Sequence, residues 1–460
     1  MAQVPLIAFY GDDFTGSTDA LECLAAAGLR TILFTDVPSP GLLSRFEGLE
    51  AIGIAGNSRG LTPEEMEPVM QEALGALRRT GAPILHYKVC STFDSSPAIG
   101  SFGRVMDIAQ RVLGPRTIPI VVGAPRLGRY SLFGTLFARH NVDGAVYRID
   151  RHPTMSVHPT TPMREGDMRR HIGAQTAQSI ALLAAPDIAG PVESAQEALD
   201  RAVNAHPGAL MMDIADDAGE ARVGMLLERM ANEAAPLFVV GSSGVEYALV
   251  GHWKAQGRLS AEVPMAPAGP VDRLFVVSGS CSPSTGAQIA AACATGFAAV
   301  ALDPVALITE GEDGPHLRAA VGDAVRLLES GRDVVVHSST GPSDGREAAV
   351  AAHFSQAGLT AGEGRIRGGR ALASAAGRIL AQVLDRVALE RFMVAGGDTS
   401  TAAIKMLGLE ALEMIAPLVP GAPLCRILGP GHPLDGRQVV LKGGQMGGPA
   451  FFAQVKAGRV

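Results

Sequence analysis

The chain has 460 residues, more than one hydrophobic core normally organises, so its length predicts two domains. Only 18% of the residues are charged and 47% are hydrophobic, which excludes a disordered chain. The formal net charge of −7 argues against the basic surface that nucleic-acid binding requires, so we expect no nucleic-acid partner.

The five cysteines are dispersed and form no C-x-x-C pair, which is typical of reduced thiols in a cytoplasmic protein. The first residues, MAQVPLIAFYGDD, lack the basic and apolar regions of a signal peptide. No run in the sequence reaches the roughly 18 apolar residues of a membrane span. We therefore expect a cytoplasmic protein with no membrane partner.

Short apolar runs alternate with Ala- and Leu-rich stretches through the first half of the chain. The runs that predict strands are residues 5–9, 31–34, 51–55, 84–87, 118–122 and 237–240. The helix after the first run has Thr15 or Ser17 as a candidate N-cap and Gly28 at its end. This alternation is typical of a mostly parallel sheet.

The same alternation returns in the second half of the chain. Strands are predicted there at residues 274–278, 299–302, 334–337, 392–395 and 439–442. A stretch rich in Pro, Ala and Gly lies between the two series and predicts a linker. The sequence thus predicts an α/β protein of two domains, each a mostly parallel sheet flanked by helices. The expected bounds are residues 1–255 and 273–460, with the linker at 256–272.

Polar residues follow the predicted strands of the first domain, at the ends where open α/β sheets bind ligands. Asp12 and Asp13 come directly after the first strand, where they could bind hydroxyls or accept a proton; a helix cap is the alternative. Arg59 follows the third strand and could hold a substrate carboxylate, although an exposed loop arginine has the same pattern.

The loop after the fourth strand is unusually polar. Its donors and acceptors suit a polyhydroxy acid and exceed what a turn needs, which favours a binding role for Lys88, Ser91, Thr92, Asp94 and Gly100. The stretch at residues 158–165 is also polar, but its two prolines could explain a rigid loop without a ligand.

Small residues follow the predicted strands of the second domain. Ser280 and Ser282 precede a helix whose free N–H groups could bind a phosphate, with simple capping by Ser282 or Ser284 as the alternative. Gly396–Thr399 repeats this arrangement, and further glycine clusters occupy residues 429–433 and 442–448. Glycine lets the backbone approach a nucleotide closely. The common nucleotide motifs G-x-x-x-x-G-K-[ST] and strand-linked G-x-G-x-x-G are absent from the sequence.

In this order, the motifs resemble those of the four-carbon acid sugar kinase family over nearly the whole chain. The resemblance is carried by Asp12-Asp13-Phe14-Thr15-Gly16, the loop from Lys88 to Gly100, Ser280-Cys281-Ser282, Gly396-Gly397-Asp398-Thr399 and the last glycine cluster. It implies an ATP-dependent kinase of threonate, erythronate or 3-oxo-tetronate, with a sugar-binding N-terminal domain and a nucleotide-binding C-terminal domain. The Ser-Thr-Phe-Asp-Ser form of the Lys88 loop is similar to that of the 3-oxo-tetronate kinases.

The resemblance also implies which residues contact the two ligands. For the acid sugar they are Asp12 or Asp13, Arg59 and the Lys88 loop; for ATP they are Ser280, Ser282, Gly396, Gly397, Asp398, Thr399 and Gly444. In one departure, members commonly end in Lys-Ser-Gly-Asn-Phe-Gly, whereas this chain has Lys442-Gly443-Gly444-Gln445-Met446-Gly447. Gly444 is kept, but the missing hydroxyl and aromatic ring affect the geometry of the site.

Together these patterns lead to a hypothesis for the reaction. Arg59 and Lys88 face the substrate carboxylate, and an aspartate, Asp13 before Asp12, orients or deprotonates the terminal hydroxyl. Asp398 joins the ligands of a Mg²⁺ ion that bridges the ATP phosphates, with helix capping as its alternative role. The expected partners are the acid sugar and ATP, and the sequence allows a homo-oligomer.

Two other classes of function stay open. One is a binding protein with vestigial nucleotide loops, which the altered tail favours. The other is a lyase or isomerase of acid sugars that works without ATP, which the glycine-rich loops disfavour. Thermal stabilisation by an ATP analogue with Mg²⁺ would support the kinase and neither alternative.

Overall fold

The computed structural model of the protein describes residues 4–140, 143–158, 160–231, 235–260, 263–341 and 343–459. The chain forms two compact units, a first unit, Met1–Val263, and a second unit, Pro264–Val460. Their boundary falls within the 256–272 stretch, of which residues 263–271 lie in no helix or strand.

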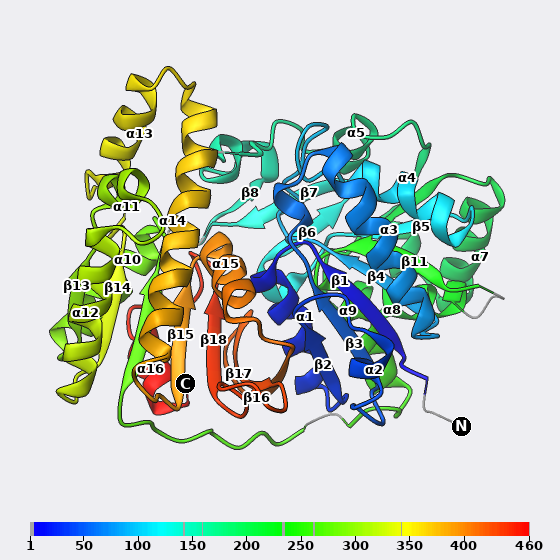
Figure 1. The fold of residues 1–460 in the computed structure, drawn as a ribbon. Helices are drawn as coiled ribbons and strands as arrows, with labels where there is room; N and C mark the ends of the chain where they lie inside the picture. The colour runs from blue at the N-terminus through cyan, green and yellow to red at the C-terminus, as the bar shows by residue number, and fades with distance from the viewer. Residues whose placement is uncertain are drawn as a thin grey trace. The chain divides into compact units, whose positions relative to one another are not determined.

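The first unit is built on a parallel sheet (Figure 1). In their order across the sheet, its strands are β2 (Thr31–Phe34), β3 (Ala51–Ala55), β1 (Ile7–Gly11), β4 (Ile84–Lys88), β11 (Leu237–Gly241), β5 (Ile118–Val121), β10 (Ala209–Met212) and β9 (Ile180–Leu183). The strands β1, β3, β4 and β11 are buried along their whole length, as expected of apolar strands covered on both faces. The sequence pattern does not predict β9 and β10, which have four residues each and adjoin Ala-rich stretches.

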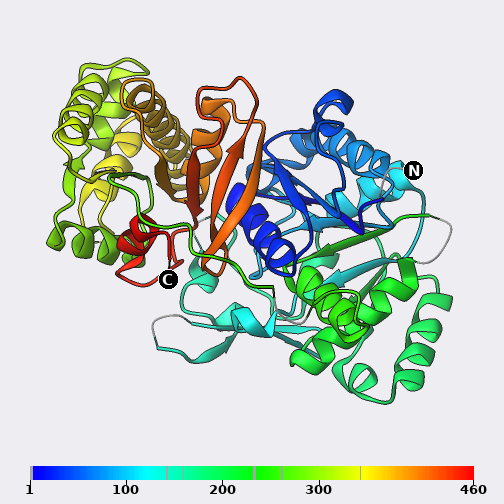
Figure 2. The ribbon, with the colours of Figure 1, turned by 90° about the horizontal axis from the view of Figure 1, so that it is seen from below.

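Helices cover both faces of this sheet. They are α1 (Phe14–Ala26), α2 (Pro40–Leu43), α3 (Pro63–Arg79), α4 (Phe102–Leu113), α5 (Met168–Gly173), α6 (Ala185–Ala189), α7 (Val192–Asn204), α8 (Asp217–Ala231) and α9 (Gly244–Ala255). Figure 2 shows α3 and α4 on one face of the sheet, and α8 and α9, in green, on the other.

Helix α1 begins one residue after the two aspartates. Its N-cap is Asp13, whose carboxylate accepts a hydrogen bond from Gly16 N. The prediction that Thr15 or Ser17 caps this helix is therefore wrong, because both residues already lie inside the helix. The helix ends before Gly28, which has a φ of 90° and so takes a conformation that favours glycine.

A small antiparallel sheet follows β5 and is also missing from the sequence prediction. Its strands are β6 (Arg129–Leu132), β7 (Thr135–Arg139) and β8 (Val146–Arg148). Most of its residues are half-buried or exposed. The sheet therefore lacks the continuous apolar runs that identify the buried parallel strands.

The second unit has a mostly parallel sheet of its own. In their order across the sheet, its strands are β13 (Ala298–Ala301), β14 (Val334–His337), β12 (Leu274–Ser278), β15 (Arg391–Ala395), β18 (Gln438–Lys442), β17 (Ala422–Leu428) and β16 (Ala411–Val419). The pairs from β13 to β18 are parallel, whereas β17 pairs antiparallel with both β18 and β16. The sequence pattern misses β16 because its buried residues alternate with less buried ones.

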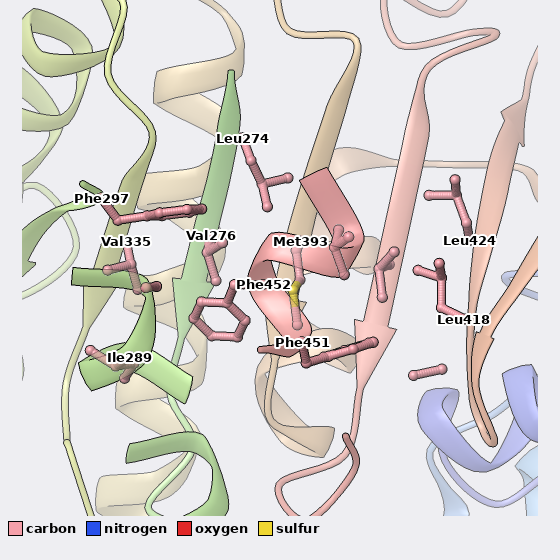
Figure 3. Close-up of a cluster of buried hydrophobic side chains, with 14 of the residues drawn as sticks. Leu274, Val276, Ile289, Phe297, Val335, Met393, Leu418, Leu424, Phe451 and Phe452 are labelled. Atoms are coloured by element: carbon pink, nitrogen blue, oxygen red, sulfur yellow. The ribbon is translucent and has the colours of Figure 1, made fainter. Parts of the chain in front are cut away.

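The helices of the second unit are α10 (Pro283–Ala294), α11 (Pro304–Glu310), α12 (Pro315–Glu329), α13 (Arg346–Gln356), α14 (Ala361–Leu384), α15 (Gly397–Leu407) and α16 (Phe451–Ala457). Phe451 and Phe452 of α16 belong to a buried cluster with Val276 of β12, Met393 of β15 and Ile289 of α10 (Figure 3). Burial of these apolar side chains fixes α10 and α16 on the sheet. In the described ranges, no helix is both long and apolar enough to cross a membrane.

Both units connect their strands along the same path. In the first unit, the chain leaves β1, forms β2 two places away, returns to form β3 between them, and then forms β4 on the other side of β1. In the second unit, β12, β13, β14 and β15 follow this path in the same order. The path reverses direction at the β1/β4 and β12/β15 pairs, and ligands of open α/β sheets bind beyond the carboxyl ends of such strands. The predicted α/β class, with mostly parallel sheets flanked by helices, is confirmed.

Candidate active site

The polar loops of the first unit meet at the carboxyl ends of β1, β3 and β4. These strands are parallel neighbours, so their ends lie at the same edge of the sheet. Two backbone hydrogen bonds tie the loops together: Asp12 N donates to Lys88 O at 2.9 Å, and Arg59 N donates to Asp12 O at 3.1 Å. Residues that are far apart in the sequence are thereby brought to one place.

Arg59 links two of the predicted carboxylates. Its Nη1 donates to Asp13 Oδ2 at 2.8 Å, and its Nη2 lies 2.9 Å from both carboxylate oxygens of Asp94. Gly100 allows the chain to pass close to Arg59, because a Cβ at Gly100 would lie 2.7 Å from Arg59 O. The side chain of Arg59 remains 30% exposed, so a ligand can still reach it.

Asp94 is buried and held by hydroxyl groups as well. Thr92 donates to its Oδ1 at 2.6 Å, and Thr161 donates to its Oδ2 at 3.1 Å. Burial raises the pKa of Asp94, but Arg59, His158 and the Thr92 hydrogen bond outweigh it and leave the pKa well below its usual range. Asp94 therefore stays ionised and fixes Arg59.

The contact of Thr161 adds a segment that the sequence pattern left without a function. The two prolines of the 158–165 loop could explain a rigid loop without a ligand, yet its Thr161 joins the Asp94 network. Pro159 lies outside the described residues. In the Lys88 loop, Ser91 is half-buried next to Thr92.

The two adjacent aspartates differ in their surroundings. Asp13 is engaged by Gly16 N and by Arg59. Asp12 is 1% exposed, and neither of its carboxylate oxygens has a hydrogen-bond partner in the part of the chain that the structure describes. Burial raises the pKa of Asp12 to about 7, although Arg59 and Lys88 partly counteract it. A carboxyl group with this pKa can hold or release a proton near neutral pH.

Lys88 completes this cluster from the end of β4. Its ammonium lies 3.4 Å from Asp19 Oδ2. Burial lowers the pKa of Lys88, but Asp19, Glu246 and Asp12 outweigh this effect and raise it, so the side chain stays charged. Asp19 is a site residue that was not predicted from the sequence; its place three residues after Gly16 on the same helix was the available signal.

Gly16 lies at the point where these charged groups converge. A Cβ at this position would lie 2.7 Å from Asp13 Oδ1, 3.3 Å from Lys88 Nζ and 3.7 Å from Asp12 Oδ1. The absence of a side chain at Gly16 therefore lets two carboxylates and an ammonium approach the first turn of α1 closely.

In the second unit, the predicted nucleotide residues also meet at one edge. They follow β12, β15 and β18, which are parallel neighbours. A Cβ at Gly444 would lie 3.0 Å from Ser280 Oγ and 3.1 Å from Ser282 Cβ, so the last glycine cluster lies against the loop after β12. Thr285 of α10 is within hydrogen-bond distance of both Ser280 Oγ (3.0 Å) and Gly444 O (2.9 Å).

The loop after β15 packs against the same residues. A Cβ at Gly396 would lie 3.0 Å from Thr399 Oγ1 and 3.4 Å from Ser280 N. Helices α10 and α15 begin here, so their N-terminal N–H groups point toward this edge. The buried hydroxyls of Ser278 and Ser400 have no hydrogen-bond partner among the described residues, which leaves them available to a ligand.

Three further predictions for this loop set can be compared with the structure. Ser282 is the N-cap of α10, which is the role given above as the alternative to phosphate binding. Asp398 does not cap α15, because the N-cap of this helix is Gly396. Asp398 is exposed in the first turn of the helix, and Gly397 before it is half-buried. The 429–433 glycine cluster follows β17 near the start of β18, at the opposite edge of the sheet, because β17 runs antiparallel to β18. Its assignment to nucleotide binding is therefore wrong.

Within the described ranges, no group of three or more His, Cys, Asp or Glu side chains could hold a metal ion by itself. A Mg²⁺ ion usually takes only one or two carboxylates from the protein and completes its shell with phosphates and water. A single exposed carboxylate such as Asp398 fits that requirement.

Comparison with known proteins agrees with this division of the chain. A family model described as a sugar-binding N-terminal domain matches residues 7–249, and one described as a nucleotide-binding C-terminal domain matches residues 275–452. The chain is 44% identical over 459 residues to the 3-oxo-isoapionate kinase of Paraburkholderia graminis, covering 99% of this chain and 95% of that protein. It is 31% identical over 446 residues to the 3-oxo-tetronate kinase of Methylobacterium radiotolerans, covering 96% of each.

The fold is also found in a crystal structure of a protein from Salmonella typhimurium LT2, with a TM-score of 0.76, 25% identity, and coverage of 97% of this chain and 98% of that one. The two curated relatives above, which match nearly the whole chain, are both named kinases. This chain belongs to the four-carbon acid sugar kinase family and is a phosphotransferase. Membership favours the kinase over the binding protein and the lyase or isomerase.

Proposed function

We propose that the protein transfers the terminal phosphate of ATP, with Mg²⁺, to a hydroxyl of a 3-oxo sugar acid, either 3-oxo-isoapionate or 3-oxo-tetronate. The observation that carries the proposal is Asp12, a buried carboxylate without a hydrogen-bond partner among the described residues and with a pKa of about 7. The names of the relatives in Paraburkholderia graminis and Methylobacterium radiotolerans support these two substrates.

In this proposal Asp12 is the general base. Both its oxygens are free to accept a hydrogen bond from the attacking hydroxyl, and its pKa is close to the pH at which a base works best. Asp13 came first in the sequence-based hypothesis, but its carboxylate already caps α1 and binds Arg59. These contacts support Asp13 as a group that holds Arg59 in place.

Arg59 and Lys88 would supply positive charge for the substrate carboxylate. Arg59 is partly exposed, and Lys88 lies close to Gly16 and to the carboxylates of Asp13 and Asp12. Sugar hydroxyls would donate to the carboxylates at the same edge. A charge-assisted hydrogen bond from a guanidinium to a carboxylate is both strong and directional.

The second unit would bind ATP through Ser280, Ser282, Gly444 and the Gly396–Thr399 loop. The close approach of these loops, the free hydroxyls of Ser278 and Ser400, and the N-termini of α10 and α15 fit a polyphosphate. Asp398 would contribute one ligand to Mg²⁺, which neutralises charge on the phosphates.

The proposal is tested by ADP release from ATP over a panel of 3-oxo-isoapionate, 3-oxo-tetronate, threonate and erythronate. We expect the highest kcat/KM with one of the 3-oxo acids. Activity should disappear on chelation of Mg²⁺, and Asp398→Ala should require a higher Mg²⁺ concentration for half-maximal rate. Consumption of an acid without ATP would identify a lyase or isomerase. Binding of an acid without any ADP release would identify a binding protein.

Replacing Arg59 by alanine is expected to raise the KM for the acid substrate about 10- to 150-fold. This factor corresponds to the free energy of one charge-assisted hydrogen bond. A sugar alcohol that lacks the carboxylate should be affected less, and this difference is measured by comparing KM for the two substrates. The matched control is Arg111→Ala, which removes an exposed ion pair with Glu67 in the same unit. Equal losses on both substrates would mean that Arg59 acts only by holding Asp13 and Asp94.

A further inference from the structure

Lys442, the last residue of β18, is a buried lysine that has no carboxylate partner among the described residues. Its side chain is fully buried, and its ammonium donates to Thr285 Oγ1 at 2.8 Å and to Gly444 O at 3.2 Å. Across the described ranges, Lys442 forms no ion pair with a carboxylate. An ammonium has three N–H donors, so the third has no protein acceptor among these residues.

The groups around Lys442 are uncharged. Thr285 and Gln288 of α10 face this loop, and Gln288 Nε2 is 2.9 Å from the carbonyl oxygens of both Met446 and Gly447. The neighbouring strand β15 ends in Ala395, beside Lys442. The titratable groups on the adjacent loops, Cys281 and Asp398, are exposed. Among the described residues, two uncharged oxygens accept hydrogen bonds from the Lys442 ammonium, and no carboxylate pairs with it.

A buried lysine is stable in a protein when it is paired or when it gives up its proton. Burial lowers the pKa of Lys442 to about 7. The same lysine lies between the Ser280 loop and the Gly444 loop, which are the two segments that enclose the proposed phosphate position. A phosphate there would be the missing counterion and would supply an acceptor for the third N–H.

We propose that Lys442 binds the phosphates of the nucleotide and takes up a proton from solvent when the nucleotide binds. This inference rests on the proposed function, in which the second unit binds ATP. In the empty protein Lys442 is partly neutral and holds the Gly444 loop against α10. With a polyphosphate beside it, the ammonium form is stabilised by the added negative charge.

Calorimetric titration of the whole protein with ADP and Mg²⁺ at pH 8, in buffers of different ionisation enthalpy, measures this coupling directly. Lys442→Met keeps the length of the side chain and removes the charge. We expect the variant to bind ADP about 10- to 150-fold more weakly, the effect of losing one charge-assisted contact. The wild type should take up close to one more proton per ADP than the variant does.

Lys405→Met is the matched control, because Lys405 is exposed near the other end of α15. It should leave both the affinity and the proton uptake unchanged. The melting temperature of Lys442→Met should stay close to that of the wild type, because loss of the hydrogen bonds to Thr285 and Gly444 is offset by removal of a buried amine that has no counterion.

The possible results separate the two proposals. If the wild type and Lys442→Met bind ADP with equal affinity, or with equal proton uptake, the role of Lys442 is wrong while nucleotide binding stands. If the wild type binds neither ADP nor ATP, the proposed function itself fails and the inference fails with it. A folded Lys442→Met protein that loses both affinity and proton uptake supports the inference.

Discussion

Asp12→Asn is expected to lower kcat by about 10²- to 10⁴-fold, the usual contribution of a general base. The amide has nearly the same size as the carboxyl group, but it cannot accept the proton of the substrate hydroxyl. In the wild type at saturating ATP, kcat/KM for the acid should rise with pH through about 7 and then level off, because Asp12 must be ionised to act as a base. Steady-state rates from pH 5.5 to about pH 9 measure both effects.

The matched control is Asp13→Asn. Asparagine is about as good an N-cap as aspartate, so helix α1 should remain, and only the ion pair with Arg59 is lost. We expect a much smaller decrease in kcat than for Asp12→Asn. The reverse order of the two effects would return the base to Asp13, and a fully active Asp12→Asn enzyme would falsify general-base catalysis by Asp12.

Asp12→Asn should also raise the melting temperature at pH 8. The pKa of Asp12 in the folded protein is about 7, above the 3.8 of a free aspartate, so the ionised carboxylate destabilises the fold. This cost is absent at low pH, where Asp12 is protonated in both states, and it grows as the pH rises from about 4 to about 7. The advantage of the variant should therefore be largest at pH 8 and vanish near pH 4. Thermal unfolding at the two pH values measures it.

Gly16→Ala should abolish most of the activity without unfolding the protein. The added methyl group would enter the space between Asp13 and Lys88, and Asp13 Oδ1 would have to move. Misplacing a catalytic or binding group by about 1 Å can lower the rate about 10²-fold, so kcat/KM for the acid should fall by at least that factor. Alanine in a helix is about 0.5–1 kcal/mol more stable than glycine, which offsets a weakened N-cap. The melting temperature should stay close to that of the wild type.

The control for this substitution is Gly75→Ala in α3, where the nearest atom to the new methyl group is the end of the Arg79 side chain, at 3.5 Å. It should leave the rate unchanged. Gly16→Ala should also leave the Kd for ADP unchanged, because Gly16 and the nucleotide loops belong to different units. A Gly16→Ala enzyme with wild-type kcat/KM would show that the positions of Asp13 and Lys88 beside Gly16 are not critical for activity.

The buried parallel strands could be predicted from the sequence because each is a continuous apolar run. Predicted and observed bounds agree for 31–34, 51–55, 274–278 and 334–337, for example. The small sheet from β6 to β8 and strand β16 could not, because their buried residues alternate with less buried ones and form no continuous apolar run. The pairing order of strands depends on contacts between distant segments, which a local pattern does not contain.

For the candidate site, too, a local pattern identified the residues but not the contacts between distant segments. A strand end followed by charged or small residues identified Asp12, Asp13, Arg59 and the Lys88 loop, which the structure brings together. The different surroundings of Asp12 and Asp13 were not predictable, because they depend on which of the two caps α1 and faces Arg59. The isolation of Lys442 likewise depends on residues of β15 and α10 that are distant in the sequence.

The common path of the chain through the two sheets suggests how each unit selects its ligand. Asp12 and Gly279 occupy equivalent positions, each being the first residue after the first strand of its unit. In the first unit this edge holds the carboxylates of Asp12, Asp13 and Asp94 beside the cations of Arg59 and Lys88. Two cations could hold the single carboxylate of a sugar acid, whereas the three carboxylates would oppose the higher charge of a polyphosphate. In the second unit the same edge holds glycines, hydroxyls and Lys442, which would attract one. The sorting of sugar acid from nucleotide would then be electrostatic, set by a few side chains on two copies of one backbone framework.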